Sequence, residues 1–323
     1  MRGTRSTLSF ATLVVAALAL LALTPRDALA WTPGTHILLG EALLRSADLL
    51  LPSSLAALLK AFPYDFLYGS IAADTSIAKR YARFGRHCHS WDVGYGILDR
   101  ARDDALRAFS WGYLAHLAAD TVAHNYFVPH QLAISWGTSG VGHSYWESRF
   151  ESHTGERWAR RAREVITLDH ARSDEHLDRI LSPTLFSTPT NRRIFRGMVY
   201  VTDNGAWQRV MALMAERSRW PLRDVAVVTH LDRSFDHIVD LLANGELSAP
   251  RALDPSGEVA LHQAKVLRRA GLLQGGERAV RREAGARFRL PETEKSWVAR
   301  LPAPLYVTAR EEVDATTAES PED

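Results

Sequence analysis

The chain has only one cysteine, Cys88, among its 323 residues. A disulfide within the molecule is therefore excluded. The fold must be held by packed apolar side chains, which make up 46% of the residues, and by any metal that it binds. Cys88 lies between His87 and His89. At that position its thiol is either a metal ligand or an inert group buried in the core.

An excess of charge of one sign is also lacking, with 39 Lys and Arg against 37 Asp and Glu. Residues 1–30 carry three Arg and one Asp, so 36 of each kind remain without them. No overall field attracts nucleic acid or anionic lipid, and nucleic acid is disfavoured as a partner. One late region is locally basic, and we interpret it as a solvated helix face, with peripheral membrane contact as the alternative. Its members are Arg268, Arg269, Arg278, Arg281, Arg282, Arg287 and Arg289.

Long apolar runs are absent except near the N-terminus, where residues 8–23 are almost all apolar. Arg2 and Arg5 precede this run, and Ala-Leu-Ala at residues 28–30 forms a small-x-small cleavage site. The pattern predicts a signal peptide over residues 1–30, export to the periplasm or the medium, and a mature chain that begins at Trp31. An uncleaved anchor is the alternative, but the run is shorter than the ~20 residues that a membrane span needs.

The rest of the chain lacks alternating strand patterns around its Asn-Gly pairs and shows helical spacing instead. This predicts an all-α, multi-helix bundle. The expected helices cover residues 37–50, 52–61, 97–126, 143–166, 189–216, 221–245 and 256–272. Ser53 or Ser54 is expected to cap the second, and Pro129 to end the third. The acidic tail from residue 303 is expected to be disordered.

One helical stretch carries His116, Asp120 and His124 at positions i, i+4 and i+8. These side chains share one helical face, with a drift of about 80° from first to last. The two His backbones lie about 12 Å apart along the axis, so a single ion bound by both is awkward. Two ions that share the carboxylate of Asp120 fit better. The stretch therefore predicts a metal site with more than one ion, and zinc is the metal that suits these ligands.

Further His and carboxylate side chains could complete such a site. They are His36, Asp74, His89, His143 and Glu147. His143 and Glu147 repeat the i, i+4 spacing, which places them on one helical face. For Asp74, capping a helix is the alternative role. His87 competes with His89 as a ligand. Seven of the 13 histidines lie between His87 and residue 153, which favours one concentrated site.

These residues resemble a known family. The pattern consists of Trp31, His36, Asp74 after Gly-Ser-Ile-Ala-Ala, His89-Ser-Trp-Asp, His116-xxx-Asp120, His124 and Gly142-His143-xxx-Glu147. It resembles the zinc-dependent phospholipase C family and the catalytic domain of glycosylphosphatidylinositol-specific phospholipase D. The resemblance covers roughly residues 31–158. Two departures are the short spacing from Asp120 to His124 and the absence of the Gln-Pro-x-His of the secreted bacterial enzymes.

The resemblance implies up to three zinc ions. The free amino group and carbonyl of Trp31 would bind one ion, with His36 beside them and Asp120 as a bridge. Asp74, His89, His116 and Asp120 would hold a second ion, and Asp74 is also the candidate general base. His124, His143 and Glu147 would hold the third. Residues 31–165 would form the catalytic core, and residues 166–302 a helical part of the same domain or an accessory region.

The activity implied is hydrolysis of a phosphodiester by zinc-activated water, as in phospholipase C or D. The substrate would be a phospholipid or a glycosylphosphatidylinositol. One alternative is a zinc nuclease of the related single-strand nuclease fold. Those enzymes carry Asn-Leu-His-xxx-Asp where this chain has Val-Gly-His-Ser-Tyr-Trp-Glu at residues 141–147, which argues against it. A non-catalytic, zinc-stabilised envelope protein is the other alternative.

Overall fold

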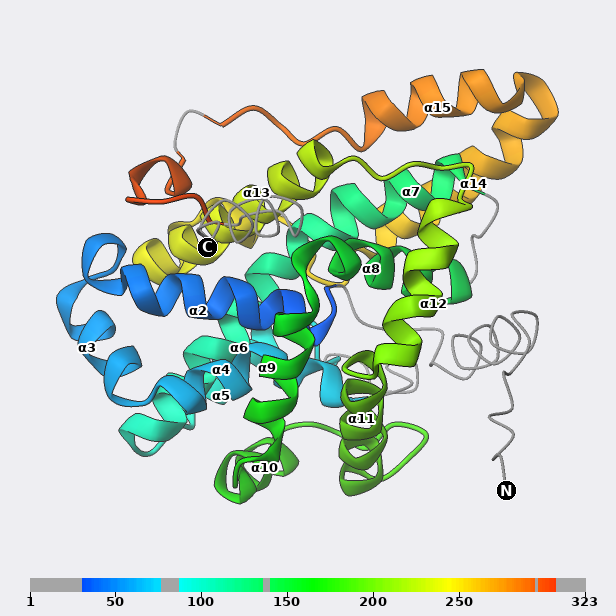
Figure 1. Ribbon diagram of the computed structural model, residues 1–323. Coiled ribbons are helices and arrows are strands. Elements are labelled where there is room, and N and C mark those ends of the chain that lie inside the picture. The colour runs from blue at the N-terminus through cyan, green and yellow to red at the C-terminus, as the bar shows by residue number, and fades with distance from the viewer. Residues whose placement is uncertain (1–30, 77–86, 136–139, 294–295, 306–323) are drawn as a thin grey trace, which may run out of the picture.

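The computed structural model describes residues 31–76, 87–135, 140–293 and 296–305. Within these ranges the regular elements are all helices, which confirms the predicted all-α class (Figure 1). The predicted signal peptide and most of the predicted acidic tail lie outside the described residues. None of the described helices is both long enough and apolar enough to cross a bilayer.

The helices follow one another with short connections. The first set is α2 (Pro33–Leu50), α3 (Ser53–Ala61), α4 (Pro63–Ala72), η1 (Ala73–Thr75), α5 (Trp91–Asp99), α6 (Asp104–Val122), η3 (Ala123–Phe127), α7 (Val128–Ile134), α8 (Gly140–Thr154) and α9 (Glu156–Thr167). The second set is α10 (Ala171–Asp178), α11 (Thr188–Thr202), α12 (Gly205–Glu216), α13 (Asp224–Asn244), η4 (Gly245–Leu247), η5 (Ala249–Ala252), α14 (Glu258–Gln274), α15 (Gly276–Arg287) and η6 (Val298–Arg300).

Helix α6 is the central element, and α4 lies directly against it. A Cβ at Gly69 of α4 would lie 2.0 Å from the carbonyl oxygen of Phe109. A Cβ at Gly112 of α6 would lie 2.0 Å from the carbonyl oxygen of Phe66. Only glycine permits backbones to approach so closely. This contact fixes the end of α4, where Asp74 follows in η1, against the middle of α6.

Several predicted helix boundaries were wrong, and the predicted helix 189–216 is two helices, α11 and α12. Residues 97–126 are not one helix, because α5 ends at Asp99 and Asp103 then caps α6 by accepting a hydrogen bond from the Leu106 N–H at 3.0 Å. Ser53 and Ser54 do not cap α3; they lie inside it, after Pro52, and make no side-chain cap.

Pro129 does not end the helical path, contrary to the prediction. Residues 123–127 form a π-helical turn in which the Val128 N–H bonds to the carbonyl of Ala123, five residues back. Pro129 follows in the first turn of α7, where its missing N–H leaves no hydrogen bond unmade. His124 lies in this π turn, a local geometry that often occurs at functional sites. The predicted helix 143–166 is likewise two helices, because Gly155 with φ 92° separates α8 from α9.

The later helices share one core with the earlier ones. Helix α13 packs along α6 and buries Leu231 and Phe235 there. A continuous apolar core contains side chains from Trp31 to Leu305. The described residues after 165 are therefore packed against the predicted catalytic core, and α13 in particular lies behind the predicted ligand helix α6.

Candidate metal centre

Buried imidazole and carboxylate side chains gather in three groups whose donor atoms lie within 4.8 Å of one another. The groups are His36, His116 and Asp120; Asp74, His89 and His116; and His124, His143 and Glu147. These are the eight side chains that the sequence predicts as ligands, and each is at most 7% exposed. Elements far apart in the chain supply them, namely α2, η1, the 87–90 loop, α6, η3 and α8.

Asp120 lies at the centre of the first two groups. Its Oδ1 is 3.3 Å from Nε2 of His36, and its Oδ2 is 2.9 Å from Nε2 of His89 and 3.1 Å from Nε2 of His116. Burial alone would raise the pKa of Asp120. The charge of His116 and the close approach of the His116, His36 and His89 rings outweigh burial and hold the pKa of Asp120 well below its usual range. Asp120 is therefore an anionic carboxylate whose two oxygens face different imidazoles, as a bridging ligand requires.

The backbone fixes which nitrogen of His116 can act as a ligand. Its Nδ1 lies 2.9 Å from the carbonyl oxygen of Ser70, which can only accept a hydrogen bond, so Nδ1 carries the proton. Nε2 is then the nitrogen that faces the carboxylate of Asp120 and the one left to bind a metal ion, so this donor set fits a metal ion.

His36 is consistent with this arrangement. Burial, followed by the nearby charge of His116, lowers the pKa of His36, so its ring is neutral at physiological pH. Its Nε2 and both carboxylate oxygens of Asp120 are buried with no well-formed hydrogen bond to any described residue. Neutral imidazole and ionised carboxylate are the forms in which these side chains bind zinc.

The third group adjoins the second, because the ring centroids of His89 and His124 are 6.1 Å apart. Nδ1 of His124 lies 2.6 Å from the carbonyl oxygen of Pro255 and so carries the proton, which leaves Nε2 as the ligand nitrogen. Nε2 of His143 is 2.8 Å from Oε1 of Glu147. The third group thus offers the same kinds of ligand atom as the second, imidazole nitrogen and carboxylate oxygen, and lies beside it.

The geometry distinguishes His89 from His87. Nε2 of His89 lies 3.4 Å from Oδ1 of Asp74, in addition to its contact with Asp120. Nδ1 of His87 instead accepts a hydrogen bond from the backbone N–H of His89 at 3.1 Å. His87, Cys88 and His89 also form a group close enough to hold an ion, and Sγ of Cys88 is 3.3 Å from Nδ1 of His89. His89 is the member that faces both carboxylates.

The indole of Trp31 is fully buried beside the site. Its Nε1–H donates to the carbonyl oxygen of Ala119 at 3.2 Å and to Oγ of Ser234 at 3.1 Å, and its ring lies 4.0 Å from that of Phe150. Ala119 immediately precedes Asp120, so Trp31 is held close to the predicted bridge. The role of its main chain as a ligand depends on removal of residues 1–30, and it stays a prediction.

A model of the zinc-dependent phospholipase C family matches residues 35–185. Over these residues the chain is similar to that family. The match includes all eight side chains of the three groups and supports a zinc phosphodiesterase. No curated protein and no solved structure matches the chain.

Sequence reasoning missed Glu151, a buried carboxylate of the family-matched region. Its Oε1 accepts a hydrogen bond from the N–H of Gly34 at 3.0 Å, next to the start of α2. Burial raises the pKa of Glu151 to about 7. Glu151 follows Glu147 by four residues, so the helical spacing that identified Glu147 could have identified it. It ties α8 to the segment that leads from Trp31 to His36.

A second missed feature is the segment at residues 253–257, named here the Pro255 segment. It lies outside the family match yet contacts the metal centre at several points. Its carbonyls at Leu253, Asp254 and Pro255 accept hydrogen bonds from Trp91 Nε1 at 2.9 Å, Asn125 Nδ2 at 2.8 Å and His124 Nδ1. These pairs are separated by more than 100 residues, so no local pattern signals them. The segment orients His124 for the candidate metal centre.

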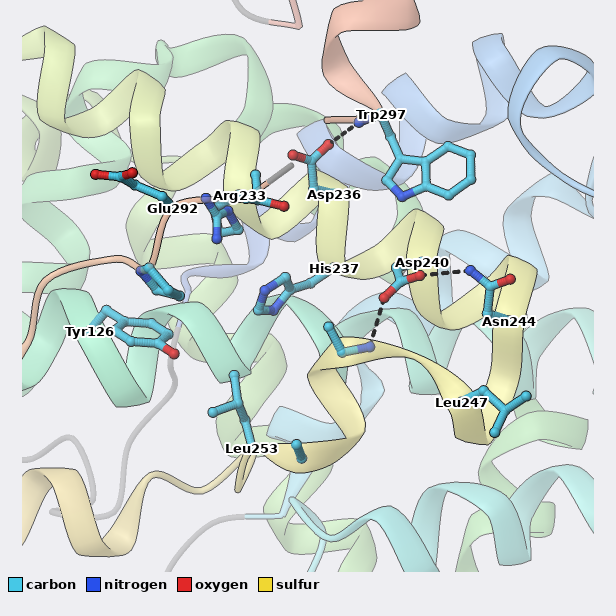
Figure 2. Close-up of a pocket in the computed structure, with 14 residues that line it drawn as sticks. Tyr126, Arg233, Asp236, His237, Asp240, Asn244, Leu247, Leu253, Glu292 and Trp297 are labelled. Carbon is cyan, nitrogen blue, oxygen red and sulfur yellow. Dashed lines mark hydrogen bonds between the residues drawn. The ribbon is translucent and has the colours of Figure 1, made fainter. Parts of the chain in front are cut away.

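A cavity of about 740 Å³ lies between α13, η5, residues 291–293 and Trp297 (Figure 2). Two of its carboxylates accept hydrogen bonds from the backbone. Asp240 accepts from the N–H of Ala249 at 2.7 Å, and Asp236 accepts from the N–H of Trp297 at 2.6 Å. Burial, and then the charge of Arg233, lowers the pKa of His237 to about 4. The described lining contains none of the eight candidate ligands, so this cavity is separate from the candidate metal centre.

Proposed function

We propose that the chain is a zinc-dependent phosphodiesterase that hydrolyses phospholipids, as a phospholipase C. The observation that carries this proposal is the set of three buried His and carboxylate groups within the family-matched region. Two backbone carbonyls, at Ser70 and Pro255, hold His116 and His124 in the tautomer that leaves Nε2 for a metal.

Up to three zinc ions fit the groups. His36 and Asp120 would hold one ion together with the main chain of a mature Trp31. Asp74, His89, His116 and Asp120 would hold the second, and His124, His143 and Glu147 the third. Trp31 becomes a ligand only if the signal peptide is removed, so this assignment is tied to export of the chain.

Zinc, when bound, lowers the pKa of a water molecule to about 7 and neutralises charge on phosphate oxygens. The chain's own residues supply the rest. Asp120 provides an anionic bridge because its pKa is held low. Asp74 is a buried carboxylate within 3.4 Å of Nε2 of His89, where it can hold an ion or accept a proton from the attacking water.

Water attack at phosphorus that breaks the P–O bond to glycerol releases diacylglycerol and a phosphorylated headgroup, and attack that breaks the P–O bond to the headgroup is phospholipase D chemistry. We favour the first because the matched family is phospholipase C. A glycosylphosphatidylinositol is the second substrate class to test. Single-stranded DNA serves as the probe for the nuclease alternative.

The test is zinc analysis of the purified chain, followed by parallel assays with phosphatidylcholine, a glycosylphosphatidylinositol and single-stranded DNA. A His143→Ala variant should lose one zinc ion and should lose hydrolysis. His262→Ala, which changes an exposed histidine of α14, is the matched control and should keep both. Preferential cleavage of DNA would contradict the phospholipase proposal, and a zinc-loaded chain that turns over none of the three substrates would favour a non-catalytic envelope protein.

A further inference from the structure

Helices α14 and α15 form a hairpin at the edge of the molecule (Figure 1). They approach closely, because a Cβ at Gly271 would lie 2.3 Å from Cγ2 of Val280. Ala264, Val280 and Ala284 are buried where the hairpin packs. Each helix therefore already uses one face for packing, and any further contact must use the outer surface.

The outer surface of α14 carries a row of exposed apolar side chains, named here the outer stripe. Val259 is 66% exposed, Val266 52% and Leu273 87%. Their spacing of seven residues places them on one side of the helix, and the exposed Ala270 lies between the last two. Soluble monomers seldom expose apolar side chains in such a row, and where they do the row commonly marks a contact surface.

Exposed cations lie on the same helix as the outer stripe, α14, and next to it in the hairpin, on α15. They are Lys265 and Arg269 on α14 and Arg278, Arg281 and Arg282 on α15. Among the described residues none of the five is in an ion pair, whereas the nearby Arg287 pairs with Glu283 at 2.9 Å. The hairpin thus presents five exposed cations, against one exposed carboxylate without an ion pair, Glu258, among its described residues, although the chain without residues 1–30 has a formal charge balance of zero.

We propose that the α14–α15 hairpin docks the protein on an anionic phospholipid surface. The inference rests on the proposed phospholipid substrate and adds how the enzyme reaches it. Apolar side chains enter the boundary between headgroups and acyl chains, while Lys and Arg contact anionic headgroups. A second copy of the chain is disfavoured as the occupant, because the same five cations would face each other across a symmetric interface.

The position of the hairpin connects this surface to the metal centre. Helix α14 begins at Glu258, directly after Gly257, and a Cβ at Gly257 would lie 2.4 Å from the carbonyl oxygen of His124. The outer stripe therefore starts beside the third ligand group. It runs outward for the length of α14, about 25 Å for 17 residues.

Co-sedimentation with vesicles tests the proposal. The full chain is mixed with vesicles of phosphatidylcholine alone or of equal parts phosphatidylcholine and phosphatidylglycerol. Wild type is expected to bind the mixed vesicles, and to bind them less at high salt. Val266→Ser with Leu273→Ser should lower partitioning by about tenfold or more. Arg281→Gln with Arg282→Gln should lower it roughly 25-fold, and only on the anionic vesicles.

Val225→Ser is the matched control. Val225 is 74% exposed near the start of α13, and its substitution should leave vesicle binding unchanged. The inference is overturned if the outer-stripe variant binds the mixed vesicles as wild type does, or if the control loses as much as that variant. It is also overturned if the outer-stripe substitutions turn a dimer into a monomer in light scattering, since the stripe would then be a self-association face.

Hydrolysis of a water-soluble phosphodiester separates this inference from the proposed function. The outer-stripe variant should keep zinc and soluble-substrate turnover at wild-type levels, while its hydrolysis of mixed vesicles falls with binding. If wild type turns over no phosphodiester, the proposed function fails whatever the vesicles show. If turnover is normal and vesicle binding is insensitive to both sets of substitutions, only the docking surface fails.

Discussion

Replacing Gly257 by alanine should displace His124 and weaken the metal centre from outside the family-matched region. The added Cβ would lie 2.4 Å from the carbonyl oxygen of His124, 2.5 Å from its Cβ and 2.7 Å from its carbonyl carbon. Two of these are backbone atoms, which cannot move aside as the end of a flexible side chain can. Relief must come from a shift of His124 or of the Pro255 segment, and either shift lengthens the hydrogen bond from His124 Nδ1 to Pro255.

The expected magnitude has two parts. A left-handed backbone at φ 58° costs alanine about 1–2 kcal/mol, and the overpacked contact costs about 1–3 kcal/mol more. Disturbing the group that orients a histidine ligand typically lowers metal affinity 10- to 100-fold. We therefore expect Gly257→Ala to lose that much affinity for one zinc ion. The measurement is competition with a chromophoric chelator, accompanied by urea denaturation.

Gly245→Ala provides the control for backbone strain. Gly245 has φ 57° and ψ −126°, a conformation at least as unfavourable for alanine, but a Cβ there would meet nothing within 4 Å. This variant should lose stability and keep wild-type zinc affinity. Equal zinc affinity in Gly257→Ala, Gly245→Ala and wild type would refute the argument that the Pro255 segment orients His124.

Three further predictions follow from the contacts described. Burial raises the pKa of Glu151 from 4.5 to about 7, so the contribution of Glu151 to stability is most favourable below about pH 4.5, where its carboxyl is protonated in both the folded and the unfolded state. About 3 kcal/mol of stability should be lost as the pH rises from about 4.5 to about 7, and Glu151→Gln should abolish this loss in urea titrations at several pH values. Ser234→Ala should cost about 0.5–1.5 kcal/mol in urea denaturation by removing an acceptor of the Trp31 indole. Removing zinc with a chelator should lower the Tm in proportion to site occupancy, and added zinc should restore it; a Tm that is insensitive to the chelator would count against a bound metal.

The ligand types and their helical spacing were predictable from sequence because those signals are local. His143 and Glu147 are one turn apart on α8, and His116 and Asp120 one turn apart on α6. The all-α class followed from the same periodicity. The assembly of these side chains into groups was reached only through the family resemblance, since His36 and Asp120 lie 84 positions apart and meet through tertiary packing.

The features that were missed depend on geometry that no short pattern carries. The π turn at residues 123–127 lets the chain pass through Pro129 without ending the helical path, and it sets the direction of His124. The Pro255 segment contacts His124 across 131 positions. The exposure of the outer stripe on α14 depends on which face packs against α7 and α15, and apolar residues alone do not reveal that.

The central claim is that Asp120 bridges two ions of a polynuclear zinc site. Its most direct test is zinc stoichiometry of the purified chain, compared among wild type, Asp120→Asn and His143→Ala, with circular dichroism to verify folding. The account predicts more than one zinc in wild type, loss of one ion in His143→Ala, and loss of a larger number in Asp120→Asn. A wild-type chain that binds a single zinc, or an Asp120→Asn variant that loses no more zinc than His143→Ala, would contradict it.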